Sequence, residues 1–94
     1  MTAATSRIDV DDERLRVTRW AFEDGAETGH HRHAYDYLVV PVTGGSFVVS
    51  DADGVSSERV QEAGVPYRGS AGAEHNVTNA SGRTAVFVEI ELKS

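Results

Sequence analysis

The stretch that decides the fold is 25–44, which reads GAETGHHRHAYDYLVVPVTG. His31 and His33 lie two residues apart within it, so their imidazoles share one face of a β-strand, because successive strand side chains alternate sides. Neutral imidazole is the commonest side-chain ligand of transition metals. His75, brought in from a distant strand, would complete a group of three. The sequence therefore predicts a metal site.

The sequence outside this stretch is also typical of β-structure. Alternation of side chains is clearest in 84–92 and looser in 14–22. Glycine turns separate the short strand-like runs, and Asp53-Gly54 between 46–50 and 55–61 predicts a hairpin. No segment of about 11 residues spaces its apolar groups at the helical period. Many short strands with regular glycine turns predict one all-β domain, a sandwich or a barrel.

Both histidine regions resemble the two sequence motifs of the cupin superfamily. Eight positions match those motifs in register: Gly25, His31, His33, Gly44, Gly64, Gly72, His75 and Asn79. Ser70 stands where the second motif usually has proline. The resemblance implies a conical jelly-roll β-barrel with one divalent metal ion inside, held by His31, His33 and His75. The stretches 35–37 and 51–54 are also similar to small cupins associated with β-alanine degradation, which indicates a pathway but no reaction.

One motif position departs from the cupin pattern. The usual glutamate is replaced by Tyr37, and Asp36 lies one residue too early. Strict alternation predicts that Tyr37 points inward and Asp36 outward, although a β-bulge would reverse the two. A site of three neutral histidines resembles those of thiol dioxygenases and of a β-diketone-cleaving dioxygenase. That resemblance implies Fe(II) and an anionic or chelating substrate, while zinc, manganese or nickel would also fit the same ligands.

Two further residues are candidates for contact with a substrate. Tyr37 is read either as a packed aromatic, as a hydrogen-bond donor to substrate or oxygen, or as a phenolate ligand. Arg68 precedes the second-motif loop and either is solvated or binds a substrate carboxylate bidentately. His30 is adjacent to His31, so alternation points it away from the site.

The remaining candidate residues are assigned to the core or to the surface. Glu89 and Glu91 are predicted to form a solvated strand face opposite an apolar row in 86–92. The aromatic residues Trp20, Phe22, Phe47 and Phe87 are predicted to form the core. Asn79 and the motif glycines are predicted to form turns.

Composition limits the compartment and the partners. The chain has 94 residues, a net charge of −6 and no cysteine, which excludes disulfides, thiolate metal sites and a cysteine nucleophile. It has no basic cluster for nucleic acid and no apolar run of about 18 residues for a membrane span. Residues 1–13 lack the apolar stretch of a signal peptide, so we expect a cytoplasmic protein.

The chain is predicted to form one domain that pairs with a second copy. Residues 1–12 are expected to be a flexible or partner-pairing segment, and residues 13–94 the cupin barrel. A chain this short has few residues left to cover an exposed edge strand once the barrel is formed. We therefore expect an edge strand to be buried in a homodimer.

Three classes of function fit these patterns. The first is a small-molecule metalloenzyme, either an Fe(II)-dependent dioxygenase with Tyr37 and Arg68 at the catalytic site, or a zinc or manganese isomerase or hydrolase. The second is a module that binds or senses a small carboxylate or a metal without turnover. The third is a structural barrel that retains only the geometry of the motifs.

Overall fold

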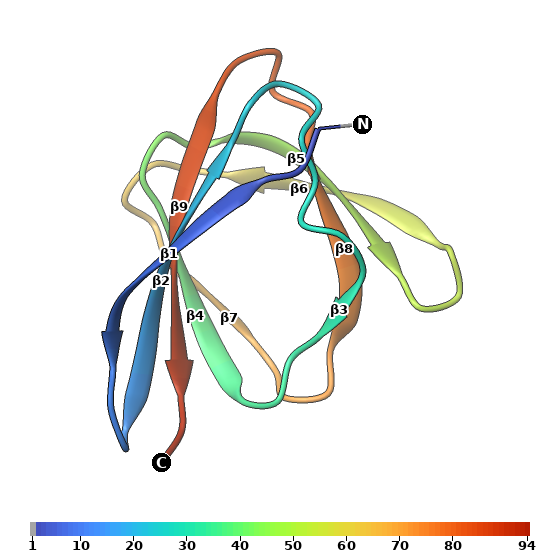
Figure 1. Ribbon diagram of the computed structural model, residues 1–94. Helices are drawn as coiled ribbons and strands as arrows, with labels where there is room; N and C mark the ends of the chain where they lie inside the picture. The colour runs from blue at the N-terminus through green and yellow to red at the C-terminus, as the bar shows by residue number, and fades with distance from the viewer. Residues whose placement is uncertain (1) are drawn as a thin grey trace.

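The computed structural model describes residues 2–94, which form nine β-strands and no helix. The strands are β1 (Thr5–Asp11), β2 (Leu15–Phe22), β3 (His31–Arg32), β4 (Asp36–Pro41), β5 (Gly45–Asp51), β6 (Ser56–Gln61), β7 (Tyr67–Gly69), β8 (Glu74–Asn79) and β9 (Ala85–Leu92). Figure 1 shows the strands arranged around an interior as a barrel. The predicted single all-β domain is confirmed.

Two antiparallel sheets make up the barrel. One has the strand order β1-β2-β9-β4-β7 and the other the order β3-β8-β5-β6. β3 and β4 follow each other in sequence but lie in different sheets, so the chain crosses the barrel between them. β3 and β4 therefore do not pair with each other.

Three phenylalanines from both sheets form the centre of the core. Phe22 lies 5.3 Å from Phe47 and 5.2 Å from Phe87, measured between ring centroids. All three rings are buried, as predicted, whereas Trp20 is only half-buried and borders a cavity. Burial of aromatic rings of this size supplies much of the hydrophobic stabilisation of a small domain.

Asn79 joins the turns around this core. Its buried amide nitrogen donates to the carbonyl oxygens of Glu23 at 3.1 Å and Arg83 at 2.6 Å, and its Oδ1 accepts from the Ser81 backbone N–H at 3.0 Å. These bonds satisfy loop carbonyls that have no strand partner. Asn79 therefore has the structural role that the sequence predicted.

The N-terminal segment contains an edge strand. β1 pairs antiparallel with β2, with an irregularity between Ile8 and Val10, and leaves its other edge free within the chain. Residues 1–12 were expected to be a flexible or partner-pairing segment, and in the structure Thr5–Asp11 of this segment pairs with β2. Pairing of this segment with a partner stays a prediction. Residues 2–94 include no helix long and apolar enough to cross a membrane.

The two faces of β9 are the reverse of the sequence expectation. Glu89 stands opposite Thr18 and Val39, and Glu91 stands opposite Tyr37. Thr18, Val39 and Tyr37 are buried, so the row that carries the two glutamates faces the interior. The prediction of a solvated glutamate face was wrong, because hydrophobicity alone assigned the apolar row to the core. That apolar row lies on the outer face of the sheet.

Candidate metal centre

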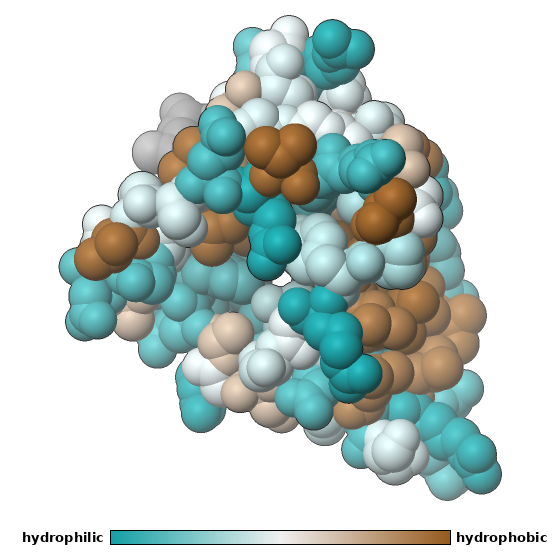
Figure 2. Space-filling model, turned by 180° about the vertical axis from the view of Figure 1, so that it is seen from behind, coloured by the Kyte–Doolittle hydropathy of each residue, from teal (hydrophilic) through white to brown (hydrophobic). Residues whose placement is uncertain are grey.

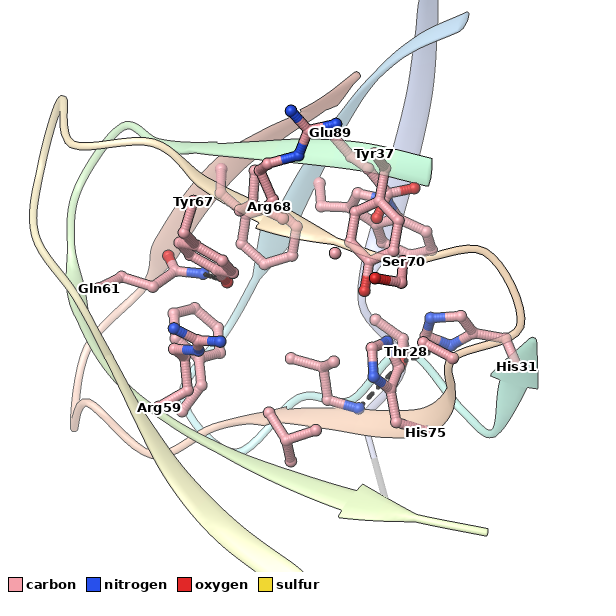
Figure 3. Close-up of a pocket in the computed structure, with 18 residues that line it drawn as sticks. Thr28, His31, Tyr37, Arg59, Gln61, Tyr67, Arg68, Ser70, His75 and Glu89 are labelled. Atoms are coloured by element: carbon pink, nitrogen blue, oxygen red, sulfur yellow. Dashed lines mark hydrogen bonds between the residues drawn. The ribbon is translucent and has the colours of Figure 1, made fainter. Parts of the chain in front are cut away.

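Three histidine side chains converge inside the barrel. His31 of β3 and His75 of β8 are directly opposite each other in the strand register, and His33 follows β3. The Nε2 atom of His33 lies 3.1 Å from Nε2 of His31 and 3.0 Å from Nε2 of His75. The candidate ligand atoms all lie within 4.8 Å of one another. Figure 3 shows His31 and His75 on the same side of the cavity.

Backbone hydrogen bonds hold His33 in place beyond the end of β3. Its N–H donates to the Ala73 carbonyl at 2.8 Å, and its own carbonyl accepts from the Gly72 N–H at 2.8 Å. Gly72 has a φ of 88°, a conformation that a residue with a side chain rarely adopts. The motif glycine thus makes the turn that sets His33 against the strand carrying His75.

The ring of His31 is oriented by a hydrogen bond on the side away from the cluster. Its Nδ1–H donates to the Gly29 carbonyl at 2.9 Å. This bond selects the tautomer in which Nε2 carries a free lone pair, which is the form that binds a metal. The loop that supplies this carbonyl is itself tied to β8, because the Gly29 N–H donates to Asn76 Oδ1 at 3.0 Å.

The donor set fits a transition-metal dication. Imidazole nitrogens about 2.0–2.1 Å from a metal and at right angles to one another would lie about 2.9 Å apart. The two short Nε2 separations of 3.0 and 3.1 Å agree with that spacing. No other group of three histidines, acids or cysteines within the described residues comes together in this way. The three histidines could therefore hold one metal ion.

The electrostatic environment keeps two of these imidazoles neutral. Burial, and then repulsion from His31, lowers the pKa of His33 to about 4. The pKa of His75 is also lowered to about 4, by burial first and then by His31 and His30. A neutral imidazole offers its lone pair without first losing a proton, so these shifts favour metal binding near neutral pH.

Neither Asp36 nor His30 belongs to the cluster. Asp36 is exposed, and its Oδ1 accepts from the Ala71 backbone N–H at 2.8 Å. His30 is also exposed and pairs with Glu74, with 2.8 Å between Nε2 and Oε1. Side chains alternate regularly across 36–37, with no β-bulge. Tyr37 therefore points inside and Asp36 outside, as strict alternation predicted.

Tyr37 lies between the histidines and the rest of the cavity. Its ring stacks on His33 with 3.9 Å between ring centroids and an interplanar angle of 22°. Burial, and then the nearby charge of Glu89, raises the pKa of Tyr37 to about 12. The side chain is therefore a neutral phenol that can donate a hydrogen bond, which argues against the phenolate ligand considered from the sequence.

Gly69 of β7 makes room for this tyrosine. It stands opposite Tyr37 in the register, and a Cβ atom on it would overlap the Tyr37 ring. The phenol can lie across β7 only because residue 69 has no side chain. The sequence analysis did not identify Gly69, because it lies between Gly64 and Gly72 and is not one of the positions that match the motif.

A cavity of about 320 Å³ adjoins the histidines. Arg68 of β7 borders the cavity, but it stands opposite Leu38 in the register, so its exposed side chain lies on the outer face of the sheet. Contact of Arg68 with a substrate stays a prediction. Sequence analysis missed Arg59 and Gln61, which line the same cavity from β6. The Arg59 guanidinium lies 4.1 Å from the ring centroid of Tyr67, and Gln61 Nε2 donates to the Tyr67 hydroxyl at 2.9 Å. These contacts join the edge strands β6 and β7 across the two sheets.

The Gly69→Ala variant is expected to bind metal at least about 10-fold more weakly, the scale of effect seen when an outer partner of a metal ligand is lost. The added methyl group displaces Tyr37 and removes the ring against which His33 stacks. Chelator competition with zinc measures the affinity. The double variant Gly69→Ala/Tyr37→Ala removes the overlap and serves as the control for backbone damage. Wild-type affinity in the single variant would contradict this role of Gly69.

Stability of the metal-free protein is expected to depend on pH through His75. Because its folded pKa is about 4 and the ordinary value is 6.5, the unfolded chain binds a proton between these values that the folded chain does not. The contribution of neutral His75 to the free energy of unfolding is therefore complete above about pH 6.5, and it is lost as the pH falls towards about 4. Urea unfolding of wild type and of His75→Gln should show a stability difference that shrinks over this range. A constant difference would contradict the lowered pKa.

The comparisons with known proteins agree with the cupin fold. No family model matches the chain. The beta-alanine degradation protein BauB of Pseudomonas aeruginosa is 46% identical over 90 residues, which cover 96% of this chain and 94% of that protein. A cupin domain from Bordetella pertussis Tohama I superposes with a TM-score of 0.94 at 44% identity, over 99% of this chain and 96% of that one.

More distant solved structures share the fold alone. The polyketide cyclase RemF of Streptomyces resistomycificus superposes with a TM-score of 0.72 at 20% identity, over 99% of this chain and 69% of that one. An identity of 46% across nearly the whole chain establishes a much nearer relationship. The chain belongs to the family of small cupins that includes the beta-alanine degradation protein BauB.

Proposed function

We propose that this cupin is a metal-dependent enzyme that acts on a small anionic or chelating molecule, and that it is an Fe(II)-dependent dioxygenase. The observation that carries the proposal is the group of three converging histidines with no carboxylate among them. Three neutral ligands leave the charge of a dication uncompensated and coordination positions open, which favours an anionic substrate that binds through two oxygen atoms. Bound Fe(II) would supply the activation of O₂, both atoms of which enter the product.

The cavity next to the histidines supports the choice of substrate class. Arg59 contributes positive charge to its wall, in a chain whose net charge is −6. Tyr37 presents a neutral hydroxyl beside the ligands, where it can donate to a bound oxygen atom. The relative from Pseudomonas is named for beta-alanine degradation. We extend that name to a substrate class, a short carboxylic acid with a second polar group on its β-carbon.

A second candidate function is a zinc or manganese isomerase or hydrolase. It is favoured by Glu89, a carboxyl group in the cavity that is suited to proton transfer. A binding or sensing role without turnover uses the same cavity. The cytoplasmic location inferred from the sequence also stays a prediction.

Wild-type protein purified without added metal or chelator is expected to contain close to one iron per chain. His75→Ala should lower metal affinity by at least about 100-fold, since loss of a ligand exceeds loss of an outer partner. Asp36→Ala is the matched control and should retain metal, because Asp36 lies outside the cluster. Elemental mass spectrometry measures the content, and O₂ uptake is then screened with small thiols, diketones and 3-oxo acids. Stoichiometric zinc with no O₂ uptake would overturn the dioxygenase and favour the second candidate.

We also propose that the protein is a homodimer formed through the outer face of the β2-β9-β4 sheet. This face carries a row of aliphatic residues, none of which is fully buried: Leu15, Val17, Leu38, Val40, Val86, Val88, Ile90 and Leu92. Figure 2 shows hydrophobic surface gathered on the side of the molecule that carries these strands. Apolar patches of this extent usually mark an interface.

The composition of this outer face favours a second copy as its partner. Arg19 and Arg68 lie on the same face as Asp36, so the edge of the patch carries charges of both signs. Two copies related by a twofold axis present the same patch to each other, and opposite charges at its edge can then pair.

The variant Ile90→Arg is expected to be a monomer, because Ile90 lies at the centre of the face, opposite Val17 and Leu38. A charge there would be buried without a partner in a dimer. Val60→Arg, at a position 68% exposed on β6, is the matched control and should leave the mass unchanged. Light scattering over a dilution series measures the mass. A monomeric wild type at every concentration up to the micromolar range would overturn the dimer.

A further inference from the structure

Glu89 lies on β9, in the sheet that faces the one carrying His31 and His75, and it projects into the cavity. In the register of β9 it stands between Thr18 of β2 and Val39 of β4, both of which are buried. Its side chain lines the same cavity as His31 and His75. Figure 3 shows Glu89 and Tyr37 on one side of the cavity and the two histidines on the other. A molecule in the cavity would therefore lie between the carboxyl group and the candidate metal ligands.

This carboxyl group has no cationic partner, in contrast to the next glutamate on the same face. Glu91 pairs with Arg16, with 3.5 Å between Oε1 and Nη1. None of the ion pairs formed by residues 2–94 includes Glu89. A half-buried acid without a cation is costly to keep in the charged form. Its position in a cavity wall indicates a role with a bound molecule rather than in the packing.

The surroundings of Glu89 suit proton transfer near neutral pH. Burial, and then repulsion from Glu91, raises its pKa to about 7. A carboxyl group with a pKa near the working pH can both accept and return a proton. The other titratable groups that line the cavity are His31 of β3, Tyr37 of β4, Arg59 of β6, Tyr67 of β7 and His75 of β8. Arg16 of β2 pairs with Glu91 on the same face of the sheet as Glu89.

We propose that Glu89 is the general base of this cavity, and that it removes a proton from the carbon between the carbonyl and the carboxylate of a 3-oxo acid. This inference rests on the proposed function, because it requires the substrate oxygens to be held at the three histidines. The C–H bond breaks, its electron pair stays on the substrate as an enolate, and the proton moves to a carboxylate oxygen of Glu89. Return of the proton from Glu89 to the same carbon restores the 3-oxo acid, so the step consumes no oxidant.

The ligand set explains why an enolate would be favoured here. Three neutral histidines provide no negative charge to balance a dication, and a 3-oxo acid that loses a proton gains one negative charge. A bound metal ion would stabilise that charge electrostatically. Tyr37, a neutral phenol next to His33, can donate a hydrogen bond to the same oxygen atom. The base thus lies across the cavity from the metal ligands, and Tyr37 reaches the same space from the side of the base.

The test is deuterium exchange into acetoacetate, measured by NMR in D₂O with zinc-loaded protein. Zinc is not redox-active, so oxygen chemistry cannot consume the probe. Glu89→Gln keeps the shape of the side chain and removes the base, and it is expected to slow protein-catalysed exchange at least about 100-fold. Its zinc content and its affinity for acetoacetate should match those of wild type. Glu62→Gln, at an exposed glutamate that does not line the cavity, is the control and should exchange at a rate close to that of wild type.

A second measurement is independent of catalysis and of metal. The side-chain carboxyl resonances of ¹³C-labelled glutamates are titrated in the metal-free protein. We expect one resonance that titrates near pH 7 and is absent from Glu89→Gln. Its absence from wild type would overturn the assignment of Glu89 as the base.

The outcomes separate this inference from the proposed function. Zinc-loaded wild type that fails to exchange acetoacetate, or Glu89→Gln that exchanges as fast as wild type, overturns the role of Glu89 and leaves the metal site standing. Wild type that binds no zinc overturns the proposed function itself. Slow exchange in Glu89→Gln with full zinc content supports both.

Discussion

The antiparallel pairing of β3 with β8 is the contact on which the candidate site depends. It is a short pairing, in which His31 stands opposite His75 and Arg32 opposite Glu74. Side chains directly opposite each other in such a ladder lie on the same face and within contact distance. A shift of one residue would turn His75 away from His31, because strand side chains alternate. The backbone bonds of His33 to Ala73 and Gly72 extend this register past the end of β3 and bring in the third imidazole.

Alternation in the opposite sheet determines what faces these histidines. Tyr37 on β4 and Glu89 on β9 both point inward, and Gly69 on β7 leaves the space in which the phenol ring lies. The inner face of this sheet therefore changes character along the strands. It is aromatic at Phe22 and Phe87, where the core is packed, and polar at Tyr37 and Glu89, where the cavity lies. The polar part would be costly to bury without a ligand or solvent, which is consistent with its position beside a cavity.

Much of the fold and the ligand set could be predicted from particular residues. The HxH pattern, the glycine turns and the match to both cupin motifs predicted a barrel with His31, His33 and His75 together, and the structure brings them together. Tyr37 was predicted to point inward because it lies an even number of residues from His31 and His33. The prediction failed for Glu89 and Glu91, because a period of two identifies two faces without saying which is inside. Arg59 and Gln61 gave no signal, because their roles depend on Tyr67 in the other sheet. Gly69 gave none, because its role depends on Tyr37 of the neighbouring strand.

The sequence by itself determined the all-β class, the turns and the candidate ligands, because these depend on local periodicity and on the chemistry of single residues. Only the tertiary structure decided which face of β9 lines the interior, which strands border the cavity, and that β1 is an ordered edge strand. Those features depend on pairing between strands far apart in the chain. The energy of such pairing comes from packing and cross-strand contacts that no single segment contains.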